Sequence, residues 1–445
     1  MAELVMKYRQ YEGYKESGVE WLDVIPSHWV MSKIKYISPF QVGWTPPTGN
    51  DSNFIGENIW ANISDLRGKI ITDTVKRISD KAAEEASMDI TPKGSLLYSF
   101  KLSVGSVSFA GCDMYTNEAI ASFTSDSLLP LEYLYYVLPK FLIENASTNI
   151  YGARILNQEL IRNAIILKPT YEEAETIANF LDHETAQIDT LIKKQQTLIQ
   201  LLKEKRQAVI SHAVTKGLNP NAPMKDLGVE WLGEVPEHWE VTKLGFHTSK
   251  IGSGKTPRGG AEVYQEEGVL FIRSQNVYDS GLRVDKSESV FVSEIIHEEM
   301  SNTKVQGGDI LLNVTGGSIG RTCIVPNSFI EANVNQHVCI VRLPISMRYF
   351  IAFVLKSSLV KEQIDSIQTG GNREGLNFEQ ISKFIICLPP EEERADIVSY
   401  IERETKKIDS LLEQSNNAIQ LMQERRTALI SAAVTGKIDV RGWNG

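Results

Sequence analysis

The chain has 445 residues, 42% of them apolar, and a net charge of −10. This length exceeds what one hydrophobic core normally serves, so we expect two to four domains, and the acidic balance argues against a simple basic DNA-binding protein. No apolar run approaches the length that spans a bilayer, about 20 residues, and the first residues are too polar for a signal peptide, so we expect a cytoplasmic protein that does not enter a membrane.

The acidic excess is unevenly distributed along the chain. Residues 30–170 hold 13 basic and 14 acidic side chains, and residues 240–386 hold 15 and 16. These two long segments are therefore almost neutral, and a basic face remains possible on either one.

The first clear element is a frame that starts at Gly18 and occurs twice. The sequence GVEWLDVIPSHWVMSK at 18–33 returns as GVEWLGEVPEHWEVTK at 228–243, with nine of sixteen positions identical. A second segment, residues 188–215, returns at 408–435 with fourteen of twenty-eight identical. Random pairing gives about one match in sixteen for average composition. The chain is therefore a two-fold internal repeat.

The segments between the repeated pieces, residues 34–165 and 245–385, diverge. They contain short apolar runs that predict strands, such as GSLLYSF from Gly94 and GDILLNV from Gly308, and stretches that predict short helices at 131–142 and 347–364. We expect a domain of mixed α/β structure in each half, so the fold class is α+β. One frame with two different inserts indicates a common scaffold that carries two different recognition surfaces.

A long helix is expected near the end of each half. Thr170 and Glu173 can form a capping box at the start of the first helix, and Pro390 suits the first turn of the second. Gly217 and Gly436 follow the two helix ends.

Both helices repeat apolar residues near a and d positions of a heptad. These residues are Ile188, Leu191, Leu198, Leu202 and Val209 in the first copy, and Ile408, Leu411, Ala418, Met422 and Leu429 in the second. We expect the copies to pack together as an antiparallel coiled coil, with packing of each helix on its own domain as the alternative. The expected domains are residues 1–170, 171–218, 219–387 and 388–445.

No motif in this sequence predicts a catalytic or nucleotide-binding site. GSGKTP at 252–257 has Ser249 where a phosphate-binding loop requires glycine, and GGSIG at 316–320 is better explained as a turn between strands. His28 and His238 recur within the repeated frame, so a structural role is expected for both. The four cysteines (Cys112, Cys323, Cys339 and Cys387) are scattered, so we expect small buried hydrophobic residues and neither a disulfide nor a metal site.

The repeated GVEWL…P-x-HW frame, the two divergent inserts and the two long helices closely resemble the specificity subunits of type I restriction-modification enzymes. The resemblance covers nearly the whole chain. It implies that each insert is a target-recognition domain for one half of a bipartite site in double-stranded DNA, and that the helices set the spacing and hold two methyltransferase (modification) subunits. Motor-nuclease (restriction) subunits would join the complex. S-adenosylmethionine, ATP and magnesium would bind to these partners, and this chain would hold no cofactor.

Polar residues at expected loop positions are the candidates for DNA contact, because base edges are read by Arg, Lys, Asn and Gln. The second insert offers Lys255, Arg258, Arg273, Gln275, Asn276, Arg321, Gln336, His337, Asn372 and Arg373. Matching positions in the first insert offer Asn62, Asp65, Lys101, Asn117, Arg154 and Gln158. A solvated loop side chain is the alternative for each of them.

Two other functions remain open at this point. The chain could be a coiled-coil adaptor whose inserts bind protein, which the near-neutral inserts favour slightly, or the recognition part of a split methyltransferase-nuclease. Salt-dependent DNA binding by the assembled complex separates the first of these from a DNA-reading subunit.

Overall fold

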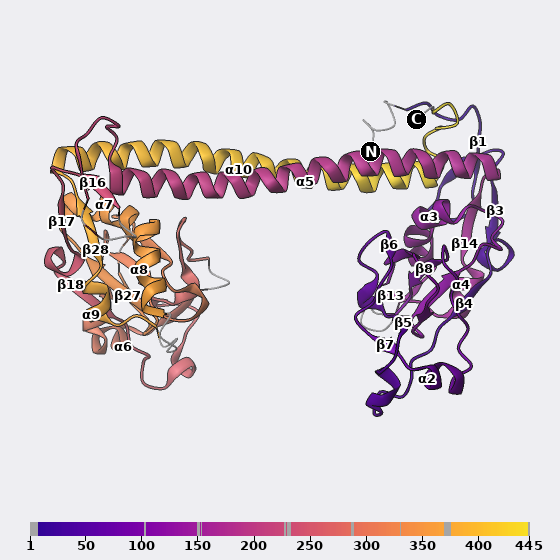
Figure 1. The fold of residues 1–445 in the computed structure, drawn as a ribbon, viewed down its shortest axis with the longest axis horizontal. Coiled ribbons are helices and arrows are strands. Elements are labelled where there is room, and N and C mark those ends of the chain that lie inside the picture. Colours follow the sequence, from indigo (N-terminus) through magenta and orange to yellow (C-terminus); the bar gives the residue numbers. More distant parts are fainter. Residues whose placement is uncertain are drawn as a thin grey trace. The chain divides into compact units, whose positions relative to one another are not determined.

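The computed structural model describes residues 8–101, 104–148, 152, 154–226, 228, 233–285, 289–329, 331–368 and 375–443. It divides into two compact units, residues 1–195 with 417–445 (unit 1) and residues 196–416 (unit 2). Each unit holds one mixed α/β domain and part of two long helices, α5 (Tyr171–Lys216) and α10 (Glu391–Val434) (Figure 1). The expected fold class is confirmed.

The domain of unit 1 is built on a five-stranded sheet of order β4-β11-β8-β9-β6. Its strands are β4 (Phe40–Val42), β11 (Ile120–Phe123), β8 (Leu96–Ser99), β9 (Val107–Ala110) and β6 (Ile70–Ile71). A second sheet has the order β10-β5-β7, formed by β10 (Tyr115–Thr116), β5 (Asn58–Ala61) and β7 (Arg77–Ile78). The antiparallel pairs are β1 (Tyr14–Glu16) with β2 (Val24–Pro26), β3 (Val30–Lys33) with β14 (Ile165–Lys168), and β12 (Ser147–Thr148) with β13 (Arg154–Ile155). The helices are α2 (Asp80–Glu85), α3 (Leu131–Glu144) and α4 (Gln158–Asn163).

The domain of unit 2 has a sheet of order β18-β27-β24-β25. Its strands are β18 (Lys250–Ser253), β27 (Val338–Arg342), β24 (Ile310–Asn313) and β25 (Thr322–Ile324). A second sheet, β22-β19-β26-β23, uses β22 (Val290–Val292), β19 (Val269–Ile272), β26 (Ala332–Val334) and β23 (Lys304–Val305). The pairs are β15 (Met224–Asp226) with β16 (Glu234–Pro236), β17 (Glu240–Lys243) with β28 (Ile385–Leu388), and β20 (Val277–Tyr278) with β21 (Gly281–Leu282). The helices are α6 (Glu294–Glu299), α7 (Ile345–Lys356), α8 (Ser358–Gln368) and α9 (Phe378–Ser382).

The two domains share one strand order although their sequences diverge. The order β4-β11-β8-β9 in unit 1 corresponds to β18-β27-β24-β25 in unit 2. In both second sheets one pair is parallel, β10 with β5 and β26 with β19. The repeat seen in the flanking sequences therefore extends through both inserts as a common backbone.

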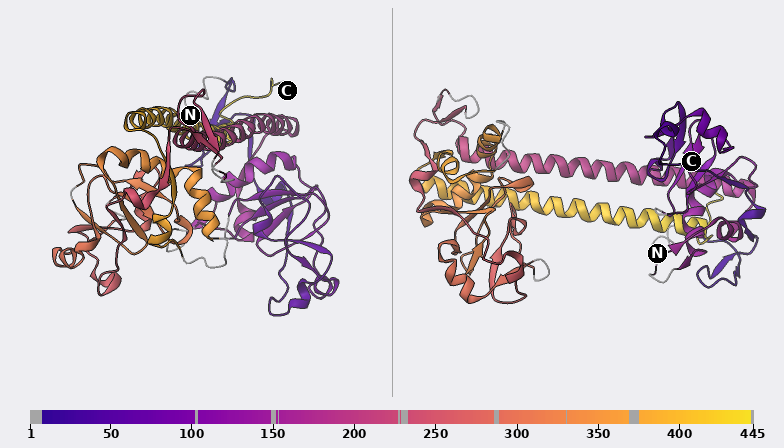
Figure 2. Two further views of the ribbon diagram at one scale, coloured as in Figure 1. Left: turned by 60° about the vertical axis from the view of Figure 1, so that its left-hand side comes forward. Right: turned by 90° about the horizontal axis from the view of Figure 1, so that it is seen from below.

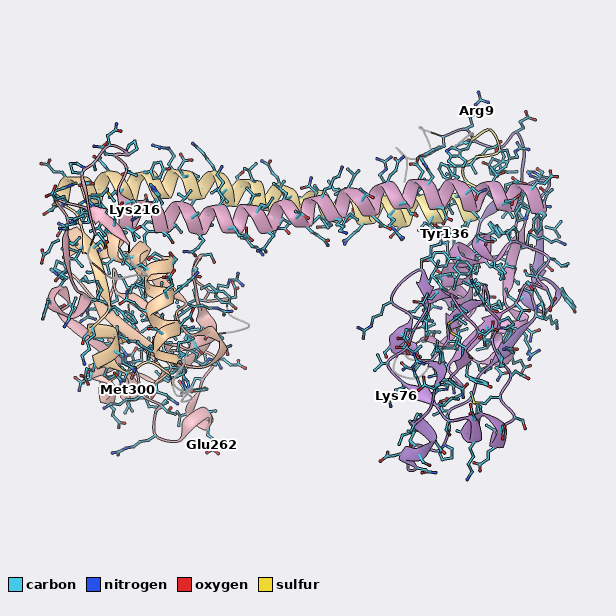
Figure 3. The ribbon with its side chains drawn as sticks, in the orientation of Figure 1. Arg9, Lys76, Tyr136, Lys216, Glu262 and Met300 are labelled. Carbon is cyan, nitrogen blue, oxygen red and sulfur yellow. The ribbon has the colours of Figure 1, made fainter. Side chains whose placement is uncertain are left out.

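Short helices dock each domain against the long ones. In unit 1 the Tyr136 hydroxyl of α3 donates a hydrogen bond to Asp182 of α5 (2.6 Å; Figure 3). In unit 2 the predicted helix at 347–364 is broken after Lys356, where Gln207 of α5 donates to the Lys356 carbonyl (2.9 Å) and Ser211 accepts the Ser358 N–H (2.8 Å). The break supplies free backbone groups that α5 satisfies, which explains why one expected helix is two.

The long helices pair along their lengths, as expected. In unit 1 Arg426 of α10 contacts Asp189 of α5 (2.9 Å), and in unit 2 Arg206 of α5 contacts Asp409 of α10 (2.9 Å). The later residue of α5, Arg206, contacts the earlier residue of α10, Asp409, so the pairing is antiparallel. Both views of Figure 2 show the helices side by side.

The buried seam confirms part of the predicted register and corrects the rest. Ile188, Leu202, Ile408 and Leu429 are buried, and Met422, Val209 and Ala418 are partly buried. The prediction is wrong for three residues, Leu191, Leu198 and Leu411, which are 51%, 41% and 47% exposed. The next residue in each case, Ile192, Ile199 and Leu412, takes the inward position. Two adjacent apolar residues satisfied the pattern equally well, so the sequence did not distinguish them.

The helix ends agree with most of the predicted signals. Gly217 and Gly436 follow the helices with φ of 74° and 70°, a backbone conformation that favours glycine. Thr170 accepts the Glu173 N–H (3.2 Å), but the Glu173 side chain points elsewhere, so only half of the capping box forms. Pro390 directly precedes α10.

All four cysteines are free. Cys323, Cys339 and Cys387 are buried as expected, and burial raises the pKa of the Cys339 thiol to about 12. Cys112 is only partly buried, and its thiol contacts the Thr72 carbonyl (3.6 Å).

Candidate nucleic-acid interface

Three loops of unit 2 meet where the parallel strands β19 and β26 end. The Asn335 N–H, just after β26, donates to the Ile272 carbonyl at the end of β19 (2.9 Å). The Gly254 N–H, just after β18, donates to the Asn335 carbonyl (3.1 Å). We call the loops at 254–256, 273–275 and 335–337 the unit 2 edge, and they bring five of the predicted residues together: Lys255, Arg273, Gln275, Gln336 and His337.

Side-chain contacts hold this edge in shape. The Thr256 hydroxyl contacts the Gln336 amide, and the His337 ring is 2.6 Å from the Thr315 hydroxyl. Lys255 and Gln336 are exposed, whereas Arg273 and His337 are half-buried. Polar donors and acceptors therefore lie on a backbone that is tied together from three strands.

Asn276 was predicted to contact DNA from a loop, but its side chain faces the interior. Its side chain is buried, accepts the Arg273 N–H (2.9 Å) and donates to the Arg283 carbonyl (3.0 Å). This amide therefore orients the loop that carries Arg273 instead of facing a ligand.

The other predicted residues of unit 2 lie outside these three loops or beyond the described residues. Arg258 is exposed beside the short helix that contains Glu262, which lies at a tip of the domain (Figure 3). Arg321 follows the GGSIG turn, which the structure confirms as a connection between β24 and β25. Asn372 and Arg373 lie outside the described residues.

Unit 1 has a corresponding edge with different side chains. The Asn117 N–H donates to the Ala61 carbonyl (2.9 Å), and the Trp44 N–H donates to the Thr116 carbonyl (2.9 Å). Asn62 follows Ala61 and corresponds to Arg273 of unit 2. The Phe100 N–H donates to the Ala119 carbonyl (3.0 Å), which places the exposed Lys101 beside the same loops.

The polar side chains of the unit 1 edge are partly used to shape it. The Asn62 side chain accepts the Ser64 N–H (2.7 Å), and Asp65 accepts the Asn62 N–H (2.9 Å), as Asn276 does for Arg273. The Asn117 side chain accepts the Ala119 N–H (3.1 Å). Among the described residues, no hydrogen bond uses the Lys101 ammonium or the side-chain nitrogens of Asn62 and Asn117.

Two predicted residues of unit 1 are not joined to this edge by the described contacts. Arg154 is exposed on the β12–β13 hairpin, where its guanidinium donates to the Ile143 carbonyl (3.5 Å). Gln158 is exposed at the first position of α4.

A shared glycine motif makes both edges possible, and it was missed in the sequence. A Cβ on Gly43 would overlap the Thr116 carbonyl, and one on Gly254 would overlap the Val334 carbonyl. Both glycines belong to the tetrapeptide G-x-T-P, at residues 43–46 and 254–257. GSGKTP is therefore part of a strand and its following loop. Comparing the inserts for short shared motifs would have found the pair.

The repeated histidines are structural, as predicted. His28 contacts Glu173 at the start of α5 (2.9 Å), and His238 contacts Glu393 at the start of α10 (2.8 Å). Within the described ranges, no cluster of three or more His, Cys, Asp and Glu side chains is placed to hold a metal ion. In the same part of the chain no helix is long and apolar enough to cross a membrane.

The family model described as the type I restriction modification DNA specificity domain matches this chain twice, at residues 26–201 and 236–421. The chain belongs to this family. Both matches include an insert, its edge and the following part of a long helix.

Relatives of the chain carry corresponding names. The MjaIX specificity subunit of Methanocaldococcus jannaschii is 24% identical over 98% of this chain and 99% of its own length. The EcoBI specificity subunit of Escherichia coli is 26% identical over 69% of this chain and 65% of its own length.

Solved structures share the fold. A chain from a study of complex assembly and conformational transition of the type I R-M system has a TM-score of 0.70 at 14% identity, covering 92% of this chain and 98% of that one. The HsdS subunit of Thermoanaerobacter tengcongensis has a TM-score of 0.54 at 14% identity, with 95% and 100% covered.

Proposed function

We propose that this chain is the sequence-reading subunit of a type I restriction-modification complex, in which each unit reads one half of a bipartite DNA site. The observation that carries the proposal is the pair of edges: one backbone frame, repeated within a single chain, presents Asn62, Lys101 and Asn117 in one unit and Arg273, Gln336 and His337 in the other. Two different surfaces on equivalent loops suit a site whose halves differ in sequence.

In this proposal the chain binds DNA and its partners supply the chemistry. The methyl donor S-adenosylmethionine, ATP and magnesium bind to the methyltransferase and motor-nuclease subunits. Two methyltransferase subunits dock along the paired helices, where Leu191, Leu201 and Leu421 expose large apolar side chains. Apolar surface on a helix pair is the kind of surface that partner proteins cover.

Exchange of one insert tests the assignment of half-sites. Replacing residues 34–165 with the insert of another specificity subunit is expected to change one half of the methylated sequence and to leave the other half unchanged. Methylated positions in the genome of a host that carries the hybrid provide the measurement. A change in both halves would contradict the proposal that the units read DNA separately.

The proposed division of labour has a separate test. The purified chain alone is expected neither to methylate nor to cleave DNA, and both activities should return when the partner subunits are added. Methyl transfer by the homogeneous chain would show that it carries a donor site.

The spacing role of the helices can also be tested. Insertion of one heptad after Leu198 and another after Ala418 lengthens both helices by about 10 Å and keeps the seam in phase. The preferred spacer between the half-sites should grow by about three base pairs, while both half-sites stay the same. If the preferred spacer did not change although the longer protein folds, another part of the complex would set the distance between the half-sites.

A further inference from the structure

Two arginines of unit 2 share one aromatic ring outside the unit 2 edge. The guanidinium carbon of Arg283 lies 3.9 Å from the centre of the Tyr278 ring, and that of Arg321 lies 5.2 Å from it. Both arginines are exposed. Their charges are therefore closer together than the screening length at 0.1 M salt, about 10 Å, and they repel each other.

No described carboxylate forms an ion pair with either arginine. Within the described part of the chain, no ion pair involves Arg283 or Arg321, in contrast to Arg342, whose guanidinium binds Asp309 (2.7 Å). The carboxylate of Asp279, next to Tyr278, accepts the Thr322 N–H instead (3.1 Å). Two guanidinium groups held on one ring, neither of them in an ion pair with a described carboxylate, suit an anion.

Two buried asparagines attach this cluster to the unit 2 edge. Asn276 bonds to the backbone of Arg273 and, through its side-chain nitrogen, to the carbonyl of Arg283. Asn313 of β24 donates from its side chain to the Ser274 carbonyl (2.8 Å), and its backbone N–H donates to the Arg321 carbonyl (2.8 Å). Both amides are buried. The loops of Arg273, Arg283 and Arg321 are therefore held in one fixed arrangement.

We propose that Arg283 and Arg321, stacked on Tyr278, clamp a phosphate group of the DNA backbone beside the base pairs that the unit 2 edge reads. The inference rests on the proposed function and changes the role of Arg321 from a base contact to a backbone contact. A bidentate guanidinium suits a phosphate, and a fixed phosphate contact sets the register in which the neighbouring side chains meet the bases.

The clamp belongs to unit 2 alone among the described parts of the two domains. The Gly320 N–H donates to the Asn313 carbonyl just as the Gly105 N–H donates to the Ser99 carbonyl. Ser99 therefore corresponds to Asn313, and Ser106 corresponds to Arg321. Unit 1 has a hydroxyl where unit 2 has a guanidinium.

Salt dependence of DNA binding tests the clamp, using the full chain in its assembled complex. The probes are a duplex with the mapped target and a duplex with the same bases scrambled. The slope of log affinity against log salt is expected to fall by about 0.9 for each phosphate that is no longer neutralised. The double variant Arg283→Ala with Arg321→Ala should therefore lower it by about that amount on both duplexes, and each single variant should lower it by part of that amount. Arg321→Lys keeps the charge and should keep most of the slope.

Two further variants control for indirect effects. Tyr278→Phe keeps the ring and should behave as the wild type, whereas Tyr278→Leu should lower the slope as the arginine variants do. Lys304→Ala removes a cation that is already paired with Glu298 (2.6 Å), and its slope should not change.

The possible failures are distinguishable. A wild-type complex without preference for the target over the scrambled duplex would overturn the proposed function itself. A wild-type preference with unchanged slopes in both arginine variants would overturn the clamp alone. Loss of discrimination at one base pair in Arg321→Ala, without a change of slope, would return Arg321 to base reading.

Discussion

The two units anchor their long helices with equivalent glutamates, but the partners of these glutamates differ. In unit 1 the buried Glu173 accepts a hydrogen bond from the Tyr11 hydroxyl (2.8 Å) and contacts His28 (2.9 Å). In unit 2 Glu393 contacts His238 (2.8 Å) and accepts from the Trp239 indole (3.1 Å). Trp29 of unit 1 corresponds to Trp239 of unit 2, but its indole nitrogen has no hydrogen-bond partner within the described residues. In unit 1 the Tyr11 hydroxyl therefore makes the bond to glutamate that the Trp239 indole makes in unit 2.

The ends of the helix pair differ in a related way. In unit 1 the Phe180 ring is covered by Tyr8 (5.4 Å between ring centres) and Trp443 (5.9 Å), which come from opposite ends of the described chain. In unit 2 the corresponding residue, Tyr400, borders an open pocket of about 520 Å³ that is also lined by Val209, His212 and Leu218.

These differences show which parts of the repeat are constrained. The carboxylate at the helix start and the strand order are the same in both units, because they satisfy buried groups and backbone hydrogen bonds. The residues that contact this carboxylate and the rings that pack near the helix ends differ between the units, because another donor or ring can occupy the same position. The exposed edges vary most, since a loop side chain can change without disturbing the frame below it.

The largest effect is expected from the glycines that both units share. Gly43→Ala and Gly254→Ala each place a methyl group on a neighbouring carbonyl oxygen, so each should destabilise its own unit by about 3 kcal/mol or more. Hydrogen exchange of peptides from each unit measures the effect separately. Gly49→Ala and Gly252→Ala are matched controls because a Cβ there meets no atom closer than 3.9 Å. Similar behaviour of all four variants would contradict the close approach.

The anchoring glutamates should give the next largest effect. Removal of a buried charged acceptor costs about 1.5–3 kcal/mol for each hydrogen bond. The Glu173 side chain is 4% exposed and that of Glu393 is 28% exposed. Glu173→Ala should therefore destabilise unit 1 by about 3 kcal/mol, and Glu393→Ala should destabilise unit 2 by about half as much. Glu172→Ala and Glu392→Ala, at exposed neighbouring positions, should have little effect, and equal losses at Glu173 and Glu393 would show that burial does not set the difference.

The architecture was readable from the sequence because it is repeated. Two copies of one frame predicted the common scaffold, the mixed α/β domains and the paired helices, and the recurrence of His28 and His238 within that frame predicted their structural role. Each of these conclusions depends on whole segments that recur in the sequence, which can be recognised without knowledge of any contact.

The details of the edges depend on contacts between distant segments and were less predictable. Asn276 resembled a base-reading residue in a loop, but the β20–β21 hairpin brings Arg283 over it and buries its amide. Nothing in the sequence singled out Arg283 and Tyr278, because only this hairpin places them beside Arg321. The helix register failed for a local reason, because Leu191-Ile192 and Leu411-Leu412 each offer two apolar residues for one inward position.

A smaller effect is expected where the two ends of the chain cover Phe180. Trp443→Ala removes ring contacts with Phe180 (5.9 Å) and His183 (5.5 Å). Aromatic pairs are worth about 0.5–1.5 kcal/mol each, so unit 1 should lose about 2 kcal/mol and unit 2 should be unchanged. Tyr400→Ala is the counterpart in unit 2, and its open pocket should limit the loss to about 1 kcal/mol. A larger loss at Tyr400 would mean that the pocket is closed in solution.

The smallest effect is expected at the exposed leucines Leu191 and Leu411, which occupy equivalent positions in the two units. Their side chains are 51% and 47% exposed, so Leu191→Ser and Leu411→Ser should change the stability of the isolated chain by less than about 0.5 kcal/mol. The adjacent inward substitutions, Ile192→Ser and Leu412→Ser, remove buried apolar surface and should cost about 2 kcal/mol each. Urea denaturation followed by circular dichroism at 222 nm measures both pairs. If the outward variants proved as costly as the inward ones, the seam would have the register first expected from the sequence, and the structure of the helix pair would need revision by one residue.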